Sequence, residues 1–151
     1  KVSDFDQLYT FYYTGFNLRA TDLQAYIGLT QIDKLDTICH RRHENFLLYN
    51  QLLSDFMPHI TVSDYVSNFA YPIISKNKET MVKRLQEEEI EVRPIICGSM
   101  GTQPVYVKKY GENRLKNASV IDKEGFYVPN HPDLTKEEIL KITTIIKENA
   151  A

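Results

Sequence analysis

Two polar side chains near the start of the chain, Asn17 and Arg19, stand where they could bind an anion. Thr21 and Gln24 follow with the spacing of a capping box, in which each side chain bonds to the other residue's backbone N–H group. A helix should therefore begin directly after Arg19. Helix N-termini present free N–H groups and partial positive charge, so a phosphate-bearing ligand is the natural candidate. A turn-forming asparagine and an arginine in a surface ion pair are the alternative.

A second cluster, Cys39, His40 and His43, carries side chains that can bind metal ions. These three residues share one predicted helix, where they do not converge on a point, and no fourth ligand is evident. We therefore expect no metal site. The other cysteine is Cys97, and the spacing of the two cysteines matches neither a disulfide framework nor a zinc motif. A reduced, cytoplasmic setting is the expectation.

The composition is that of an ordinary globular protein. The chain has 151 residues, of which 42% are hydrophobic and 25% are charged, and this suits one domain with a buried core. A formal net charge of −2 offers no basic field for nucleic acid. No apolar run reaches the roughly 20 residues that a membrane helix needs, and the N-terminal sequence is unlike a signal peptide. The first residue is not methionine, which is compatible with a fragment.

The candidate residues must be positioned by elements that the sequence pattern predicts. Residues 1–20 are rich in aromatic side chains without a clear period, and we interpret them as an extended arm that docks on its own domain or on a partner. From Thr21 to about Phe56, apolar residues recur every three or four positions, which predicts a helix that Pro58 ends. Unbroken, it would be ~54 Å long, so it either bends or gives its first turns to a different contact surface. Gly28 is expected to permit a close backbone approach.

Short strands and helices alternate after this helix. We expect strands at 59–62, 68–74, 90–96 and 126–128, the third of them interrupted by Pro94. Helices are expected at 77–88, 117–124 and after 135, with a loop at 97–101 and an irregular or helical turn at 103–110. Pro72 places the second strand at a sheet edge. Thr135 and Glu138 form a second capping box. The economical fold is α+β, with a few-stranded, mainly antiparallel sheet, helices on one of its faces and a long leading helix.

The stretch around Asn17 also resembles a known sequence block. Residues 15–28, GFNLRATDLQAYIG, are similar to a block of the DegT/StrS family of sugar-nucleotide aminotransferases and their dehydratase relatives, which are fold-type-I enzymes that use pyridoxal phosphate. Further similar segments follow in the family's order: Arg41-Arg42, Tyr49-Asn50, Val92-Arg93-Pro94, Gln103-Pro104-Val105-Tyr106, Gly125-Phe126-Tyr127-Val128-Pro129 and Pro132-Asp133-Leu134-Thr135. Their order and spacing make the resemblance specific, and it covers nearly the whole chain.

The resemblance implies the small C-terminal domain of such an enzyme, with residues 1–20 as an arm at the dimer and active-site interface and residues 21–151 as the domain itself. In the family, the asparagine of the first block crosses a dimer interface to the cofactor phosphate of the neighbouring subunit. Asn17 occupies that position, and its amide N–H suits a phosphate oxygen. Arg19 would add charge nearby, as a bidentate partner of a phosphate or carboxylate.

The resemblance also implies substrate contacts. In the family, the turn at Arg93 lies at the active-site mouth, and Pro94 biases Arg93 toward an extended, fixed direction. A solvated arginine at a strand end is the alternative. Ser99 and Gln103 could contact a sugar or a diphosphate, although an ordinary loop accounts for them equally. His131 is a turn residue or a further substrate contact.

The catalytic centre of a pyridoxal-phosphate enzyme needs a lysine for the Schiff base and an acidic partner for the pyridine nitrogen. In the family, both lie upstream of the asparagine block, in a large N-terminal domain that this chain lacks. We therefore assign no catalytic residue to this chain. It should contribute only the contact to the partner subunit's cofactor and part of the substrate mouth.

The function that the resemblance implies is the C-terminal part of a cytoplasmic aminotransferase that acts on a nucleotide-linked keto sugar, in the synthesis of deoxyamino sugars for surface polysaccharides. Its partners would be a second subunit of a homodimer, the large N-terminal domain and the nucleotide sugar, without nucleic acid or membrane. A pyridoxal-phosphate sugar 3-dehydratase is the close alternative, because the loop after Arg93 is similar to that of relatives acting on keto-deoxyhexose nucleotides. A non-catalytic dimerisation or binding module is the alternative of another class.

Overall fold

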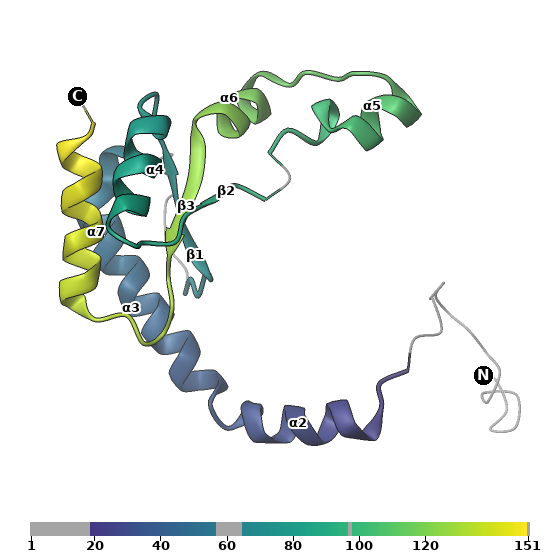
Figure 1. The fold of residues 1–151 in the computed structure, drawn as a ribbon. Coiled ribbons are helices and arrows are strands. Elements are labelled where there is room, and N and C mark those ends of the chain that lie inside the picture. Colours follow the sequence, from purple (N-terminus) through teal and green to yellow (C-terminus); the bar gives the residue numbers. More distant parts are fainter. Residues whose placement is uncertain (1–18, 57–64, 97, 151) are drawn as a thin grey trace, which may run out of the picture. The chain divides into compact units, whose positions relative to one another are not determined.

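The structure, a computed structural model, describes residues 19–56, 65–96 and 98–150 (Figure 1). The chain divides into two compact units, Lys1–Leu35 and Asp36–Ala151. In chain order the elements are α2 (Asp22–Ile32), α3 (Leu35–Leu53), the 3₁₀ turn η1 (Ser54–Phe56), β1 (Ala70–Ile74), α4 (Lys78–Glu87), β2 (Arg93–Pro94), the 3₁₀ turn η2 (Met100–Thr102), α5 (Pro104–Tyr110), α6 (Lys116–Glu124), β3 (Gly125–Pro129) and α7 (Lys136–Glu148). The predicted strand at 59–62 and nearly all of the predicted arm lie outside the described residues.

The long predicted helix is interrupted after Ile32, so that α2 and α3 are separate helices. A turn at residues 33–34 divides them, and the backbone N–H of Lys34 donates to the carbonyl of Gln31 at 3.0 Å, three residues back. Aspartate, which occupies position 33, is among the weaker helix formers. The interruption resolves the excess length that the sequence pattern implied.

Helix α2 begins at the predicted capping box. The Thr21 hydroxyl accepts from the Gln24 backbone N–H at 3.3 Å, and the Gln24 side chain accepts from the Thr21 N–H at 3.0 Å. None of the residues of α2 is buried in the described structure. No described atom lies within 4 Å of the Cβ that a substitution at Gly28 would add, so the close approach expected there is not seen.

The sheet has the order β1-β3-β2, and both pairs are antiparallel. Among the described residues, strand β1 lies at the edge of the sheet, as Pro72 predicted. Strand β2 has only two residues, far fewer than the predicted span of 90–96. Pro94 has no backbone N–H to donate to the ladder, which accounts for the early end of this strand.

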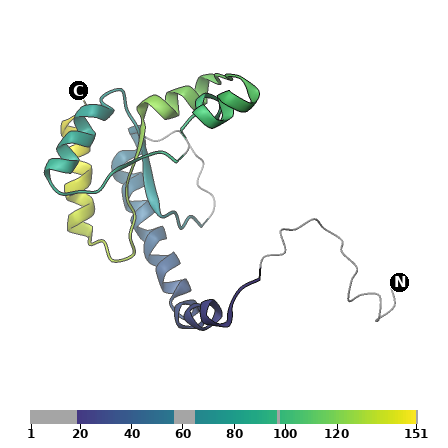
Figure 2. The ribbon, with the colours of Figure 1, turned by 45° about the vertical axis from the view of Figure 1, so that its right-hand side comes forward.

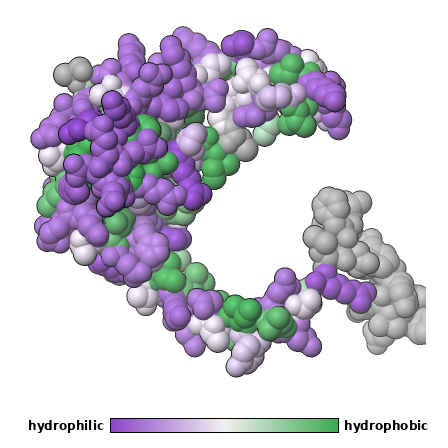
Figure 3. All heavy atoms as spheres, viewed as in Figure 1, coloured by the Kyte–Doolittle hydropathy of each residue, from purple (hydrophilic) through white to green (hydrophobic). Residues whose placement is uncertain are grey.

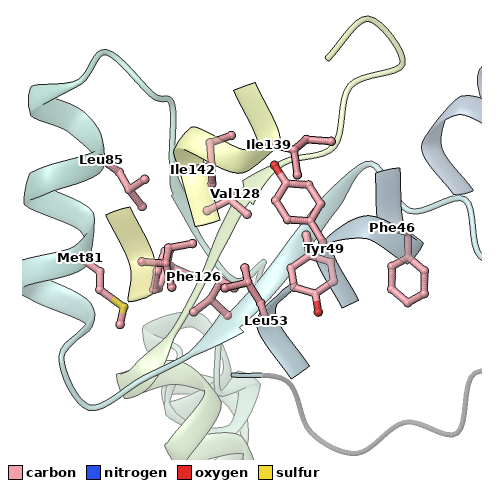
Figure 4. Packing of buried hydrophobic residues seen from close by; sticks show 12 residues of the cluster. Phe46, Tyr49, Leu53, Met81, Leu85, Phe126, Val128, Ile139 and Ile142 are labelled. Atoms are coloured by element: carbon pink, nitrogen blue, oxygen red, sulfur yellow. The ribbon is translucent and has the colours of Figure 1, made fainter. Parts of the chain in front are cut away.

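Helices α3, α4 and α7 pack on one face of the sheet, so the predicted α+β architecture is confirmed. Tyr71 pairs with Val128 and Ile73 pairs with Phe126 across β1 and β3, and all four side chains face this core. Helices α4 and α7 lie side by side in both ribbon views (Figures 1 and 2). The core, shown in Figure 4, consists of Phe46, Tyr49, Leu53, Tyr71, Ile73, Met81, Leu85, Phe126, Val128, Ile139, Ile142 and Ile146.

Helices α5 and α6 confirm the helical turn predicted at 103–110 and the helix predicted at 117–124, although neither buries a residue. A close backbone contact closes this segment: the Asn113 N–H donates to the Gly101 carbonyl at 3.0 Å. A Cβ at Gly101 would lie 1.9 Å from the Asn113 carbonyl oxygen, so glycine permits the contact. Within the described ranges, no helix combines the length and the apolarity that crossing a membrane requires.

Candidate functional site

The face of the sheet away from the core carries the candidate site. Arg93 and Tyr127 are paired across β2 and β3, and therefore project from the same side of the sheet. Tyr127 alternates with the buried Phe126 and Val128, which places it on the side opposite the helices. A pocket of about 390 Å³, here called the open-face pocket, is lined by Phe69, Ala70, Glu91, Arg93, Tyr127, Val128, Pro129, Asn130 and His131.

Arg93 supplies the positive charge of the open-face pocket. Its Nε donates to the Glu91 carboxylate at 2.8 Å, and both side chains are largely exposed. An exposed ion pair of this kind contributes at most about 1 kcal/mol. The guanidinium could therefore exchange Glu91 for a phosphate or carboxylate of a ligand at small cost, and could bind that group in a bidentate manner.

His131 lies in the loop between β3 and α7. Its Nδ1 accepts from the Asp133 backbone N–H at 3.2 Å, and the same atom lies 3.4 Å from the Asp133 carboxylate. In the neutral imidazole this bond leaves the hydrogen on Nε2, which makes Nε2 a donor. The structure thus brings Arg93 and His131, two predicted substrate residues that are distant in sequence, into one pocket.

Two aromatic rings, from Phe69 and Tyr127, line the pocket beside its polar groups. The ring centroids of Phe69 and Tyr127 are 5.6 Å apart, with the planes inclined at 59°. Such rings offer apolar surface to a ligand that also carries a charged group for Arg93. Neither ring was predicted as a site residue. The alternation of Phe126, Tyr127 and Val128 was the available signal, because it turns Tyr127 away from the core.

Buried polar side chains hold the end of β3 against α3. The Asn45 amide donates to the His131 carbonyl at 2.9 Å, and the Tyr49 hydroxyl donates to the Pro129 carbonyl at 2.9 Å. Burial, reinforced by the carboxylate of Glu138, raises the pKa of Tyr49 well above its ordinary value. The hydroxyl therefore remains a donor throughout the physiological range, and the backbone of residues 129–131 stays fixed to α3.

Ser99 and Gln103, the other two predicted substrate residues, are not among the residues that line the open-face pocket. Ser99 is only 1% exposed, and its hydroxyl has no hydrogen-bond partner in the described structure. Gln103 precedes α5. Their contact with a substrate stays a prediction.

The predicted cofactor contacts divide between described and undescribed residues. Asn17 lies outside the described residues, whereas Arg19 is described and exposed, just ahead of α2. The phosphate contact of both stays a prediction. In the part of the chain that the structure describes, no group of three or more histidine, cysteine or acidic side chains could hold a metal ion, and Cys39 is a free thiol.

Comparison with known proteins places this arrangement in context. The model of the DegT/DnrJ/EryC1/StrS aminotransferase family matches residues 2–147. The lipopolysaccharide biosynthesis protein RfbH of Salmonella typhimurium is 30% identical over 95% of this chain and 36% of its own length. The UDP-4-amino-4,6-dideoxy-N-acetyl-beta-L-altrosamine transaminase of Helicobacter pylori is 28% identical over 85% of this chain and 36% of its own length.

A solved structure shows the same fold. The GDP-4-keto-6-deoxy-D-mannose-3-dehydratase of Escherichia coli, with bound hydrated pyridoxal phosphate, superposes with a TM-score of 0.75 at 25% identity. The match covers 95% of this chain and 40% of that protein. The chain therefore spans about two fifths or less of the length of these three proteins.

Proposed function

The chain belongs to the DegT/DnrJ/EryC1/StrS aminotransferase family, and from this premise we propose that it forms the C-terminal part of a pyridoxal-phosphate aminotransferase acting on a nucleotide-linked keto sugar. The parent reaction is amino transfer, in the synthesis of deoxyamino sugars for surface polysaccharides. The role of this chain is to bind and orient the substrate at the mouth of the active site.

One observation carries the proposal: Arg93 and His131 meet in the open-face pocket beside an aromatic pair. A nucleotide sugar combines anionic phosphates with flat or ring-shaped apolar surfaces. Arg93 suits the phosphate, because a guanidinium binds such groups in a bidentate manner. His131 offers its Nε2–H group as a donor to a hydroxyl or carbonyl, and Phe69 and Tyr127 exclude water from one side of a bound ring.

No lysine is among the residues that line the open-face pocket, so this pocket does not supply the covalent anchor of the cofactor. When bound, pyridoxal phosphate supplies the electron sink for amino transfer, and the lysine that anchors it would come from the large N-terminal domain. Asn17 and Arg19 would contribute hydrogen bonds and charge to the cofactor phosphate of a second subunit. They hold the phosphate and take no part in proton transfer.

The partners follow from the same proposal. A homodimer is required if Asn17 serves the neighbouring subunit, and the large N-terminal domain completes each active site. Helix α2 offers a surface for such contacts, since its apolar residues are exposed and none is buried. A cytoplasmic setting suits both cysteines, and nucleic acid and membrane have no part in the proposal.

A sugar 3-dehydratase with the same cofactor is the second candidate. The observation that favours it is the superposition on a 3-dehydratase over 95% of this chain. The two activities share the cofactor and the class of substrate. Product analysis separates them, because a transaminase yields an amino sugar and a dehydratase yields a deoxy sugar that keeps its keto group.

The substrate role of Arg93 is tested in the enzyme that contains this chain. We expect Arg93→Ala to raise KM for the nucleotide sugar about tenfold or more, since a tenfold change is about 1.4 kcal/mol and a charge-assisted bond is worth at least that. Arg114→Ala is the matched control, because Arg114 forms a similar exposed pair with Glu112 and does not line the pocket. Equal KM values for wild type and Arg93→Ala would remove the pocket from the substrate path.

A second test separates this chain from a complete enzyme. After incubation with pyridoxal phosphate and borohydride reduction, mass spectrometry of the 151-residue chain should find no single, stoichiometrically labelled lysine. The reason is that selective labelling needs one lysine positioned in a cofactor site, and no lysine is among the residues that line the open-face pocket. Complete labelling of one lysine would show that the chain holds the cofactor by itself.

A further inference from the structure

Asn130 is a fully buried residue at the end of β3, and its amide joins three separate parts of the chain. Its Nδ2 donates to the Asn68 carbonyl at 2.9 Å, to the Asn68 side-chain Oδ1 at 2.8 Å and to the Arg42 carbonyl at 3.1 Å. An amide nitrogen has two hydrogens, so three acceptors share them. This one side chain thus connects β3 with α3 and with the residues that precede β1.

The role of Asn130 in joining β3 to the residues before β1 follows from the preceding residue, Pro129. The β1–β3 ladder ends at the pair Ala70 and Pro129, and proline has no N–H to continue it. Beyond that point the two chains are joined by side chains instead. Asn130 donates to Asn68, and the Asn68 amide donates in turn to the Ala70 carbonyl at 2.7 Å.

The hydrogen bonds between Asn130 and Asn68 connect two segments that line opposite sides of the open-face pocket. Phe69 and Ala70, next to Asn68, form one wall, and Pro129 and His131, on either side of Asn130, form the other. The Asn130–Asn68 pair is therefore the fastening between the two walls. Asn130 borders the open-face pocket but has no exposed surface, so it acts on the pocket through its neighbours and not by contact with a ligand.

We propose that Asn130 is a positioning residue, which sets the separation of Phe69 and His131 and thereby the affinity of the open-face pocket for substrate. The inference rests on the proposed function, which makes this pocket the substrate site. Without the Nδ2 donors, the carbonyls of Asn68 and Arg42 would lose their shared partner. The wall at Phe69 would then be joined to the wall at His131 only through the β1–β3 ladder, which ends at Ala70 and Pro129.

The test uses three variants of the enzyme that contains this chain. Asn130→Ala removes all three bonds of the amide, and Asn68→Ala removes its side-chain acceptor and the bond to Ala70. Asn130→Asp keeps the shape but points a carboxylate oxygen at carbonyl acceptors. Ile146→Val is the control, because it shortens a buried core side chain on α7 that does not line the pocket. We expect each of the three variants to raise KM for the nucleotide sugar at least fivefold with kcat changed less than twofold, and the control to leave KM unchanged.

The double variant Asn130→Ala, Asn68→Ala should raise KM little further than Asn130→Ala alone, because Asn130→Ala already removes both bonds between Asn130 and Asn68. Hydrogen exchange followed by mass spectrometry gives a second measurement that needs no substrate. The amides of 68–71 should exchange at least tenfold faster in Asn130→Ala than in wild type, and at the wild-type rate in Ile146→Val.

These measurements distinguish failure of the positioning role of Asn130 from failure of the proposed function. An enzyme that turns over nucleotide sugars with the same KM in Asn130→Ala as in wild type would overturn the positioning role, whatever the change in stability. Unchanged exchange at 68–71 in Asn130→Ala would overturn the fastening itself. If the wild-type enzyme turned over no nucleotide sugar, the proposed function would fail, and the exchange measurement would still decide whether Asn130 joins the two walls.

Discussion

At the scale of single residues, Tyr49 and Tyr71 place two hydroxyl groups inside the core. Their rings are stacked with centroids 4.9 Å apart, and the Tyr49 hydroxyl has a carbonyl partner at Pro129. Burial raises the pKa of Tyr71 to about 12, from an ordinary value of 10.0. Burial, and secondarily Glu138, raises the pKa of Tyr49 further.

These raised pKa values predict unfolding at alkaline pH. Above pH 10 the unfolded chain releases both phenolic protons while the folded chain keeps them, so the folded state binds more protons and stability falls as pH rises. Stabilisation is complete below pH 10 and is lost as pH rises through the folded values, at about 1.4 kcal/mol per pH unit for each tyrosine. Urea unfolding between pH 8 and about pH 12 measures the slope.

The control for this prediction is a pair of phenylalanine variants. Tyr71→Phe should reduce the alkaline slope, because the titrating group is gone. Tyr49→Phe should do the same and also cost about 1 kcal/mol at pH 7, for its lost hydrogen bond. Tyr26→Phe should change neither quantity, since Tyr26 is 69% exposed. A slope that is the same in all three variants would contradict the assignment.

At the scale of elements, the two capping boxes have the same geometry but begin helices of different burial. The box of Thr135 and Glu138 begins α7, which buries four residues, and the box of Thr21 and Gln24 begins α2, which buries none. Hydrogen bonds from Thr135, through its backbone and side chain, hold the pKa of Glu138 below its ordinary value. The depressed value contributes stability above the ordinary pKa, and that stability is lost as pH falls through the folded value.

Because α7 is buried in the core and α2 is not, removing the capping threonine should change the free energy of unfolding by different amounts in the two helices. Thr135→Ala should lower the free energy of unfolding by about 1 kcal/mol, because α7 folds together with the core. Thr21→Ala should leave the unfolding of the core unchanged and only reduce the helical content of α2. Urea unfolding monitored by near-ultraviolet signals from the buried tyrosines, together with circular dichroism, measures both. An equal loss of stability in the two variants would mean that α2 is coupled to the core.

At the scale of the whole molecule, α2 presents an apolar surface that the described chain does not cover. Leu23, Tyr26, Leu29 and Ile32 are between 59% and 69% exposed, and Ile27 is 54% exposed. Figure 3 shows apolar residues at the surface of this segment. Contiguous apolar surface of this kind usually marks an interaction site.

The exposed apolar surface of α2 predicts that the isolated chain self-associates or precipitates, and that a charged substitution on this surface reduces the association. Ile27→Asp should lower the apparent mass in sedimentation or light scattering without lowering the stability of the core, because Ile27 makes no buried contact there. Lys34→Gln is a control for the change in charge, since it also changes the net charge by −1 and Lys34 lies outside both helices. A wild-type chain that remains monomeric at high concentration would contradict the prediction.

Local features of the fold could be predicted from the sequence. The two capping boxes, the helix at 117–124 and the edge position of β1 depend on residues close together in the chain, such as Thr135 and Glu138, or on one residue, such as Pro72. The order of the family segments identified the family by the same kind of evidence. Two features of length were predicted only in outline: the sequence indicated that the long helix bends or divides its contacts, and that Pro94 disturbs the strand at 90–96, but the interruption after Ile32 and the two-residue length of β2 came from the structure.

The sequence alone determined which side chains could do chemistry. Residue type fixes the charge and the hydrogen-bond donors of a side chain, and local spacing indicates the face of a helix or strand from which it projects. Only the tertiary structure decided that Arg93 and His131 share a pocket while Ser99 and Gln103 do not line it. It also decided that Tyr127 and Phe69 face that pocket and that Asn130 joins its walls. The physical reason is register: antiparallel pairing of β3 with β1 and β2 sets residues opposite one another that are about 30 to 60 positions apart, and no local pattern encodes that alignment.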